Sequence, residues 1–221
     1  MRTSKIKILL MLLAVIYSCQ NEVLQKKQTT ASTLFTLIPN EQTNVHFFNT
    51  VKEDINFHAL NYPYVYNGGG VAIGDVDNDG FDDIYFTSNQ GSSKLYMNKG
   101  DFKFEDVTDK ANVGAEGGWT TGVSMIDINN DGWLDIYVCK SAFRDNGILR
   151  KNKLFVNQGD GTFNEEATKW GLDDDGFSIQ SYFFDYDNDG DLDMFLVNHR
   201  EDFINSINLD NILADEDFFP Q

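Results

Sequence analysis

Three segments of this chain repeat one pattern and align with one another without gaps. They read GVAIGDVDNDGFDDIYF from Gly70, GVSMIDINNDGWLDIYV from Gly122 and QSYFFDYDNDGDLDMFL from Gln180. The first aspartates of their acidic clusters, Asp75, Asp127 and Asp185, are 52 and 58 residues apart. Units of this kind cannot bury their hydrophobic faces alone, so they stack on one another. The repeat therefore predicts a fold built from similar, stacked pieces.

Within each repeat, the apolar residues follow the period of a β-strand rather than that of a helix. Val71 and Ile73 alternate before the first acidic cluster, and Ile84 and Phe86 alternate after it. A second pair of strands is indicated by KLYMNKGDFKFEDVT in the first repeat and KLFVNQGDGTFNEEAT in the second, where glycines mark hairpin turns. Four short antiparallel strands per repeat predict an all-β fold made of β-propeller blades.

The predicted blades fall within one domain, residues 41–221. The repeats are expected at about 66–113, 117–172 and 177–221, the last of them incomplete. The second repeat is longer between its acidic cluster and its hairpin, and the extra residues near 141–150 are expected to form a loop. One helix is expected at 201–213, where the apolar residues fit a helical face only loosely. The chain thus holds two full repeats and the start of a third.

The acidic clusters have the spacing of a loop that wraps around a hard cation. Oxygen-bearing side chains stand at the first, third, fifth and ninth positions, and a glycine stands at the sixth, where the chain must turn sharply. Ca²⁺ takes about 6–8 oxygen ligands, to which the backbone carbonyl of the seventh position would add one. The predicted ligands are Asp75, Asp77, Asp79, Phe81 and Asp83 in the first loop, Asp127, Asn129, Asp131, Trp133 and Asp135 in the second, and Asp185, Asp187, Asp189, Asp191 and Asp193 in the third. We expect about three calcium ions, bound most weakly by the second loop because Asn129 replaces an aspartate there.

Other interpretations of these loops are disfavoured. An EF-hand begins with a similar sequence but needs a glutamate at the twelfth position, between two helices. That position holds Phe86, Val138 and Leu196, and strands are predicted on both sides of each loop. Asp, Asn and Gly also favour ordinary turns, but turns alone do not explain three such loops in register. Magnesium prefers a few carboxylates and retained waters to a cage of this kind.

The charge of the chain excludes one class of partner. It has 17 lysines and arginines against 35 aspartates and glutamates, for a formal charge of -18. Nucleic acid is excluded because its binding depends on Lys and Arg side chains that neutralise phosphates. Because 11 carboxylates stand at predicted calcium-ligand positions, much of the acidity belongs to sites rather than to a solubilising surface.

The N-terminus has the pattern of an export signal. Cationic residues precede an unbroken apolar run, 8–16, that is too short to span a bilayer. Residues 1–18 resemble a lipoprotein signal peptide with Cys19 as the lipid-accepting residue, and an ordinary secretory signal is the alternative. The polar segment 19–40 is expected to be a tether. These features predict a cell-envelope protein, anchored by lipid in the outer membrane or at the cell surface. The other cysteine, Cys139, is expected to be a buried thiol in a strand.

The repeats resemble those of the FG-GAP/VCBS type, which form calcium-loop blades in integrin α-subunit propellers and in exported bacterial proteins, here of the cartilage-acidic-protein-like group. The resemblance rests on D-x-[DN]-x-D-G-x-x-D between strands, on the preceding GVAIG and TGVSM, and on NQGDGTF at 157–163. It covers about residues 60–200. It implies a propeller of about seven blades, with ions between the first two strands of each blade and a role in adhesion or ligand binding.

The number of repeats falls short of such a ring, since only about three of the expected blades are present. The chain is therefore expected to be the N-terminal part of a longer protein that supplies downstream blades. A native gene product near 25.1 kDa, the mass of the chain itself, would contradict that expectation.

The first functional hypothesis is a non-enzymatic binding or adhesion module. Its surface would be formed by the loops 114–121, 141–152 and 171–178, and its ligand would be a protein or a glycan. Trp119 in the first of these loops can either stack on a sugar or partner, or pack in the core. The other two tryptophans, Trp133 and Trp170, are expected to pack.

The alternative hypothesis is an enzyme, a polysaccharide lyase or hydrolase on a propeller scaffold. Its catalytic groups would have to come from His46, His58, His199, tyrosines and spare acids, none of which are paired at a diagnostic spacing. The sequence contains no G-x-S-x-G motif, no phosphate loop and no dinucleotide fingerprint. The binding hypothesis is therefore favoured.

Overall fold

The computed structural model describes residues 34–55, 57–143 and 145–200. The predicted signal peptide, Cys19, most of the predicted tether and the predicted helix at 201–213 lie outside the described residues. The chain divides into two units, Met1–Ile38 and Pro39–Gln221, and the second holds all the described helices and strands. In the part of the chain that the structure describes, no helix has the length and apolar character needed to cross a membrane.

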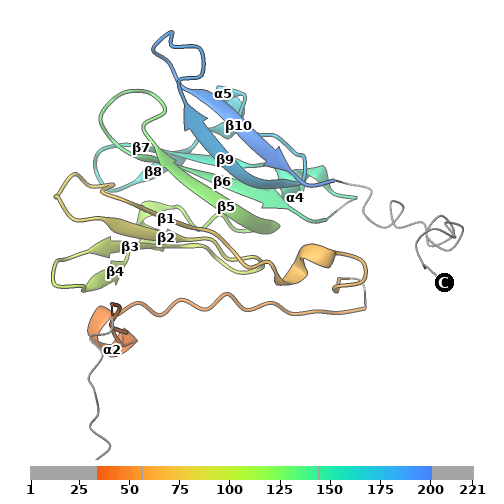
Figure 1. Ribbon diagram of the computed structural model, residues 1–221, viewed down its shortest axis with the longest axis horizontal. Helices are drawn as coiled ribbons and strands as arrows, with labels where there is room; N and C mark the ends of the chain where they lie inside the picture. The colour runs from red at the N-terminus through yellow and green to blue at the C-terminus, as the bar shows by residue number, and fades with distance from the viewer. Residues whose placement is uncertain (1–33, 56, 144, 201–221) are drawn as a thin grey trace, which may run out of the picture. The chain divides into compact units, whose positions relative to one another are not determined.

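Three antiparallel sheets make up the second unit (Figure 1). Blade 1 contains β1 (Val71–Gly74), β2 (Asp83–Phe86), β3 (Lys94–Asn98) and β4 (Phe104–Asp106), in that order. Blade 2 contains β5 (Trp119–Ile126), β6 (Asp135–Ser141), β7 (Lys153–Asn157) and β8 (Phe163–Glu165). In blade 3 the structure describes β9 (Ser178–Phe184) paired with β10 (Asp193–Asn198). The predicted all-β fold with blades of four antiparallel strands is confirmed.

The pairing register preserves the repeat in three dimensions. The same two positions of the repeat face each other in each blade, in the pairs Ile73 with Ile84, Met125 with Ile136, and Phe183 with Met194. The first strands of the three blades are neighbours, because β5 contacts both β1 and β9. The three acidic loops therefore close equivalent hairpins, at the same end of three adjacent strands.

Strand β6 is the centre of the packing because both of its faces are covered. Ile136 and Val138 pack in a cluster that blade 2 shares with blade 1. Tyr137 and Cys139, on the opposite face, belong to a cluster that includes Phe183 of blade 3. The predicted burial of the Cys139 thiol is confirmed, and burial raises its pKa to about 12, so the thiol stays protonated and acts as a packing group.

One aromatic position of the repeat shows how each blade is covered by the next. Tyr85 in blade 1 and Tyr137 in blade 2 are both 0% exposed, each in the cluster shared with the following blade. Phe195 holds the same position in blade 3 and is 60% exposed. Tyr182 and Phe184 of β9 are exposed as well, and Phe195 pairs with Tyr182 across the hairpin. Within the described residues, blade 3 thus presents an aromatic face.

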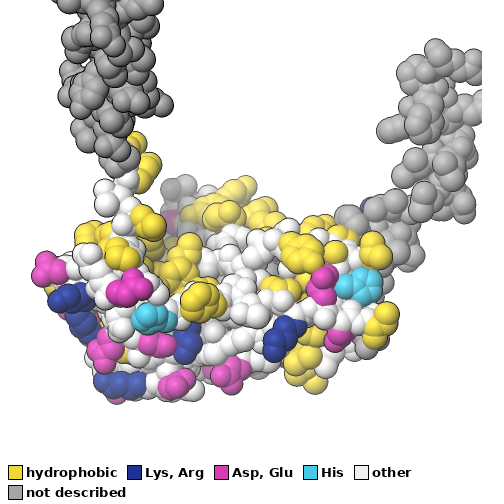
Figure 2. Space-filling view, turned by 90° about the horizontal axis from the view of Figure 1, so that it is seen from below, with side chains coloured by type: hydrophobic (Ala, Val, Ile, Leu, Met, Phe, Trp, Pro, Cys, Tyr) yellow, Lys and Arg dark blue, Asp and Glu magenta, His cyan; other side chains and the backbone are white. Residues whose placement is uncertain are grey.

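The chain segment before blade 1 runs along that blade in Figure 1. It includes the one-turn helix α2 (Asn40–Thr43) and the 3₁₀ helix η1 (Pro63–Tyr66). Phe47 stacks on Phe86 of β2 with ring centroids 4.9 Å apart. Seen from below, the molecular surface mixes hydrophobic, acidic and basic side chains, with no extended patch of one charge (Figure 2). The acidity of the chain is therefore not gathered on this face.

Short helices are the main departure from the expected elements. One-turn helices α3 (Thr108–Ala111) and α5 (Ala167–Trp170) follow the fourth strand of blades 1 and 2, and α4 (Gly147–Arg150) lies among the extra residues of the second repeat. A single turn is too short to produce a helical period in the sequence. The expectation that Trp170 packs is wrong: it is 39% exposed, and its indole N–H donates to Glu166 Oε2 at 3.2 Å.

Candidate functional site

The three acidic loops follow β1, β5 and β9 and contain the same hydrogen bonds. The first aspartate of each loop accepts from the backbone N–H groups of the fifth and sixth residues. These bonds join Asp75 to Asp79 and Gly80 at 3.1 and 2.9 Å, Asp127 to Asp131 and Gly132 at 3.0 and 2.8 Å, and Asp185 to Asp189 and Gly190 at 3.2 and 3.1 Å. An aspartate carboxylate accepts readily from N–H groups that follow it closely in the chain. The first aspartate therefore closes each loop on itself.

The turn in each loop depends on a left-handed backbone. Gly80, Gly132 and Gly190, at the sixth position, have φ angles of 92°, 88° and 96°. These values strain any residue that carries a Cβ, whereas glycine adopts them at little cost. The sharp turn predicted at the sixth-position glycine is confirmed.

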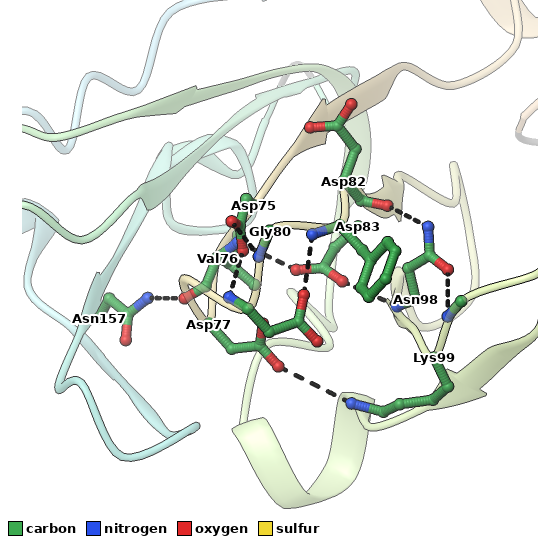
Figure 3. Close-up of polar contacts among 12 residues, drawn as sticks. Asp75, Val76, Asp77, Gly80, Asp82, Asp83, Asn98, Lys99 and Asn157 are labelled. Carbon is green, nitrogen blue, oxygen red and sulfur yellow. Dashed lines mark hydrogen bonds and ion pairs between the residues drawn. The ribbon is translucent and has the colours of Figure 1, made fainter.

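The ninth aspartate fixes each of the first two loops to its own blade. Its carboxylate accepts from one backbone N–H in the loop and from one at the end of the third strand, which for Asp83 are those of Val76 and Asn98, at 2.9 and 2.8 Å (Figure 3). Asp135 makes the equivalent bonds in blade 2 at 2.9 and 2.8 Å. Burial raises the pKa of both carboxyl groups to about 6, and the nearby loop aspartates add to the shift. A cation beside them would favour the ionised form.

Carboxylates from the first, third and ninth positions converge. Oxygen atoms of Asp75, Asp77 and Asp83 all lie within 4.8 Å of one another, and so do those of Asp185, Asp187 and Asp193. In the second loop, Asn129 holds the third position and offers an amide oxygen in place of a carboxylate. Several oxygen donors gathered in this way are the ligands that Ca²⁺ takes, each at about 2.3–2.6 Å from the ion. The donor set fits a hard divalent cation.

The fifth position is not brought into these groups of carboxylates. The side chains of Asp79, Asp131 and Asp189 accept from the seventh-position N–H groups of Phe81, Trp133 and Asp191 at 2.9, 2.9 and 3.1 Å. In the second loop, the amide of Asn129 also donates to Asp131 Oδ2 at 2.8 Å. To serve as ligands, these carboxylates would have to turn toward the ion. Ligation by the fifth side chain and by the seventh carbonyl stays a prediction.

Two asparagines that the sequence analysis did not single out hold the loops in place. Asn98 and Asn157 end β3 and β7, and their backbone N–H groups meet the ninth aspartates. The side chain of Asn98 donates to the carbonyl of Asp82 at 3.0 Å, and that of Asn157 donates to the carbonyl of Val76, in the neighbouring blade, at 2.8 Å. The signal was present in KLYMNKG and KLFVNQG, where the same asparagine recurs before the hairpin turn.

Among the described residues, a lysine forms an ion pair with a loop aspartate in the first loop only. Lys99 Nζ lies 3.7 Å from Asp77 Oδ2 (Figure 3), and the equivalent residue in blade 2 is Gln158. An exposed ion pair of this kind contributes little to stability, so a divalent cation can displace it. The first two loops also touch each other, since the Asn78 amide donates to the carbonyl of Gly132 at 3.1 Å.

The three histidines considered for catalysis have separate partners. His46 Nδ1 lies 3.4 Å from the Asn40 amide, and His58 Nδ1 accepts from the backbone N–H of Leu60 at 3.2 Å. His199 Nε2 lies 2.9 Å from Ser141 Oγ, but Ser141 is 0% exposed. Trp119 lies in β5 and is 1% exposed, so of its two alternatives the structure shows packing in the core.

Two comparisons with known proteins bear on this site. A family model described as FG-GAP-like repeat matches residues 75–138 and 142–196, which is more than half of the chain and includes all three acidic loops. The chain is also 31% identical over 139 residues to "Cartilage acidic protein 1" of Xenopus tropicalis. That match covers 60% of this chain and 20% of the relative, so the chain spans about one fifth of the length of the curated relative it matches.

Proposed function

Since this chain belongs to the FG-GAP-like repeat family, we propose that it is a calcium-binding β-propeller protein that acts as a non-enzymatic binding or adhesion module at the cell envelope. The observation that carries the proposal is the threefold recurrence of one loop with the same hydrogen bonds, together with the convergence of carboxylate oxygens from the same positions in the first and third loops. Acidic residues that serve only to keep a surface soluble would not form the same hydrogen bonds at the same positions of three loops.

Calcium supplies the physical link between these loops and a binding role. Without a cation, the carboxylates that converge in each loop repel one another, and the repulsion opposes the fold of the hairpin. An ion in each loop removes the repulsion. It also links the two sides of the turn between the first and second strands, which in blade 1 are Asp75 after β1 and Asp83 at the start of β2. Calcium would thus stiffen the blades, and stiff blades hold the connecting loops in place for a partner.

Export and lipid anchoring form the second part of the proposal. They are supported by the apolar run at 8–16 and by Cys19, which follows it at the spacing of a lipoprotein signal. A chain cleaved before Cys19 would be held at a membrane by acyl groups rather than by a helix. Mass spectrometry of the membrane-extracted protein tests this, because an acylated N-terminal Cys19 is expected and a free one would contradict it.

The third part of the proposal is that further blades complete the ring. Propellers close with about 4–8 blades. The position that Tyr85 and Tyr137 bury beneath the following blade is 60% exposed at Phe195. A further blade of the same kind would cover Phe195 together with Tyr182 and Phe184.

A non-enzymatic role is supported by the surroundings of the histidine that contacts a serine. Ser141 would be the nucleophile of a Ser–His pair with His199, but a fully buried hydroxyl cannot reach a substrate. In the described part of the chain, the side chains of His46 and His58 form hydrogen bonds with an asparagine amide and a backbone N–H, neither of which is a nucleophile.

A calcium titration of the full chain tests the proposal. The chain is first stripped with chelator, then titrated with calcium while bound ions are counted by calorimetry and the unfolding midpoint is followed by circular dichroism. We expect about three ions and a higher midpoint, since an ion that binds only the folded state stabilises it. A folded chain that binds no calcium would overturn the metal assignment.

A matched pair of variants assigns the ions to loops. The double substitution Asp185→Asn with Asp187→Asn removes two converging carboxylates from the third loop and should lower the count by one. Asp191→Asn lies in the same loop, but its side chain is not a predicted ligand, so it should leave the count unchanged.

A further inference from the structure

The first two acidic loops are joined by a continuous chain of hydrogen bonds. It begins at Asp83, the ninth residue of the first loop, whose carboxylate accepts from the backbone N–H of Val76 at 2.9 Å. The carbonyl of Val76 accepts from the side chain of Asn157 at 2.8 Å (Figure 3). The backbone N–H of Asn157 then donates to Asp135, the ninth residue of the second loop, at 2.8 Å. Two residues thus connect two predicted metal ligands that belong to different blades.

Burial makes this chain of bonds the main connection between the two loops. Val76, Asn157 and both ninth aspartates are each 3% exposed or less. Water therefore cannot replace a broken bond, and the broken bond leaves a buried polar group unpaired. A second link, from the Asn78 amide to the carbonyl of Gly132 at 3.1 Å, lies at the surface, where water competes with it. The exposed link should therefore contribute less than the buried one.

The chain of bonds passes between predicted ligands of the first loop. Val76 stands between Asp75 and Asp77, whose carboxylates converge with that of Asp83. The N–H of Val76 is bonded to Asp83 and its carbonyl to Asn157, so this part of the backbone is held from both sides. The ninth aspartate of the second loop holds Asn157 in turn. An ordered second loop therefore helps to keep the three carboxylates of the first loop together.

Order in one loop lowers the cost of ordering the other. A loop that takes up a cation must fix its carboxylates in one arrangement, and the freedom that it loses reduces its affinity. When the second loop is already fixed, part of this loss has been met in the first loop through Asn157 and Val76. Repulsion between the two cations opposes the gain, but the carboxylates of each loop balance its charge and solvent ions screen the remainder.

We propose that the first and second loops bind calcium cooperatively, with Asn157 as the residue that carries most of the coupling and Asn78 as a weaker second link. This coupling rests on the proposed calcium binding and adds a regulatory property to it. Each loop raises the affinity of the other by the same factor. In the second loop, where Asn129 replaces a carboxylate, the coupling offsets part of the lost affinity. The two blades then reach their stiff form over a narrower range of calcium concentration than two independent loops.

Blade 1 offers an internal reference for the role of Asn157. Asn98 holds the equivalent position, and each of the two asparagines accepts through Oδ1 from the backbone N–H of the glycine two residues later, at 3.0 Å. Each also donates to a carbonyl of its own blade, that of Asp82 for Asn98 and that of Leu134 for Asn157, at 3.0 and 3.1 Å. The bond to Val76 in the neighbouring blade is what distinguishes Asn157.

The test follows each loop separately by heteronuclear amide NMR during a calcium titration of the full chain. The signals are those of the sixth-position glycines, one for each loop, Gly80, Gly132 and Gly190. The double substitution Asp127→Asn with Asp131→Asn empties the second loop by removing two of its carboxylates. We expect it to lower the calcium affinity of the first loop about fivefold, which is the effect of one net hydrogen bond. Equal affinities of the first loop in the two chains would overturn the proposed coupling.

Asn157→Ala should abolish this dependence, so that emptying the second loop changes the affinity of the first by less than about twofold. The matched control is Asn98→Ala, which removes the same bonds within a blade but spares the bond between blades. The fivefold dependence should persist in this control. A dependence that survives Asn157→Ala undiminished would assign the coupling to charge and would overturn the role of the hydrogen bonds.

A second matched pair gives a result even where Asn157→Ala does not fold. Asn78 is exposed, so Asn78→Ala should leave the fold intact and reduce the dependence to about threefold. Asn130 holds the same position in the second loop and forms no side-chain hydrogen bond to the first loop within the described residues, so Asn130→Ala should leave the dependence unchanged. Equal dependence in both variants and in the parent chain would contradict a hydrogen-bonded link.

The same titrations separate the coupling from the proposed calcium binding. Glycine signals that do not respond to calcium in any loop would refute the calcium assignment itself. A chain that binds about three ions in loops that titrate independently would refute the coupling alone.

Discussion

Asp83 Oδ1 lies 2.8 Å from the backbone nitrogen of Asn98, so the last residue of the first acidic loop is bonded to the last residue of β3. The same 2.8 Å bond joins Asp135 to Asn157 in blade 2. One buried carboxylate thus links a candidate metal loop to the hairpin that follows it. The loop and the outer part of the blade should therefore gain and lose their order together.

Replacing this carboxylate should cost stability even without metal. Asp83→Ala leaves the backbone N–H groups of Val76 and Asn98 without their acceptor, at about 1–3 kcal/mol for each buried group. We expect the free energy of unfolding in chelator to fall by about 2–4 kcal/mol, as measured by urea denaturation. Asp82→Ala is the control, because the neighbouring side chain is exposed and should change stability by no more than about 0.5 kcal/mol. Equal losses for the two variants would contradict the linking role.

The second loop should bind calcium more tightly after Asn129→Asp. The new carboxylate adds a charge at the third position, and we expect the affinity of that loop to rise about tenfold in calorimetric titrations. In chelator the variant should be less stable, because the bond from the Asn129 amide to Asp131 is replaced by repulsion. Asn130→Asp adds the same charge at the next residue, which is not a predicted ligand. A similar gain in calcium affinity for Asn130→Asp would show that any added negative charge raises the affinity, and that the third position has no special role.

The stability of the calcium-free chain should fall as pH rises from about 4 to about 6. An unfolded aspartate titrates near pH 3.9, whereas burial raises the pKa of Asp83 and of Asp135 to about 6. Between these values the folded chain binds more protons than the unfolded chain, so the free energy of unfolding decreases with pH. The urea midpoint in chelator should therefore be higher near pH 5 than near pH 7.

Calcium should reverse this dependence, because the ion requires the ionised carboxylates. Its stabilisation should be present above about pH 6 and lost below it. The double substitution Asp83→Asn with Asp135→Asn should flatten the profile in chelator. A urea midpoint in chelator that rises between about pH 4 and pH 6 would contradict the prediction that Asp83 and Asp135 control the stability of the calcium-free chain.

The aromatic position of the repeat that holds Tyr85, Tyr137 and Phe195 should tolerate substitution by alanine only in blade 3, at Phe195. Tyr85→Ala removes a fully buried ring and should cost about 3–5 kcal/mol. Phe195→Ala, at the equivalent and exposed position, should cost no more than about 0.5 kcal/mol in the 221-residue chain. In a longer product with a further blade, the cost of Phe195→Ala should approach that of Tyr85→Ala. Equal tolerance of Phe195→Ala in both products would contradict the proposed further blades.

The blades could be predicted from the sequence because their signals are local. The alternation of Val71 with Ile73, and the glycines in the hairpins, fix strand and turn within a few residues. The turn at Gly80, Gly132 and Gly190 could also be predicted, because glycine is the residue that adopts a positive φ angle at little cost.

The remaining features depend on contacts between distant residues. No local pattern marks the bond from the side chain of Asn157 to the carbonyl of Val76, because it crosses from one blade to another. Aromatic contacts likewise join Phe57 to Trp119 and Tyr62 to His199, from different segments of the chain. The fifth-position carboxylates of the loops could not be placed either, since metal and backbone N–H groups compete for the same oxygens.

The length of β5 is greater than the distance over which solvent ions screen the charge of the second acidic loop. Trp119 begins this strand and Asp127 follows its last residue, so its 8 residues hold Trp119 and the second acidic loop about 25 Å apart. At physiological ionic strength the field of an exposed charge fades over about 8 Å. That distance is about three screening lengths. The charge of an ion in the second loop is therefore screened before it reaches Trp119, at the other end of the strand.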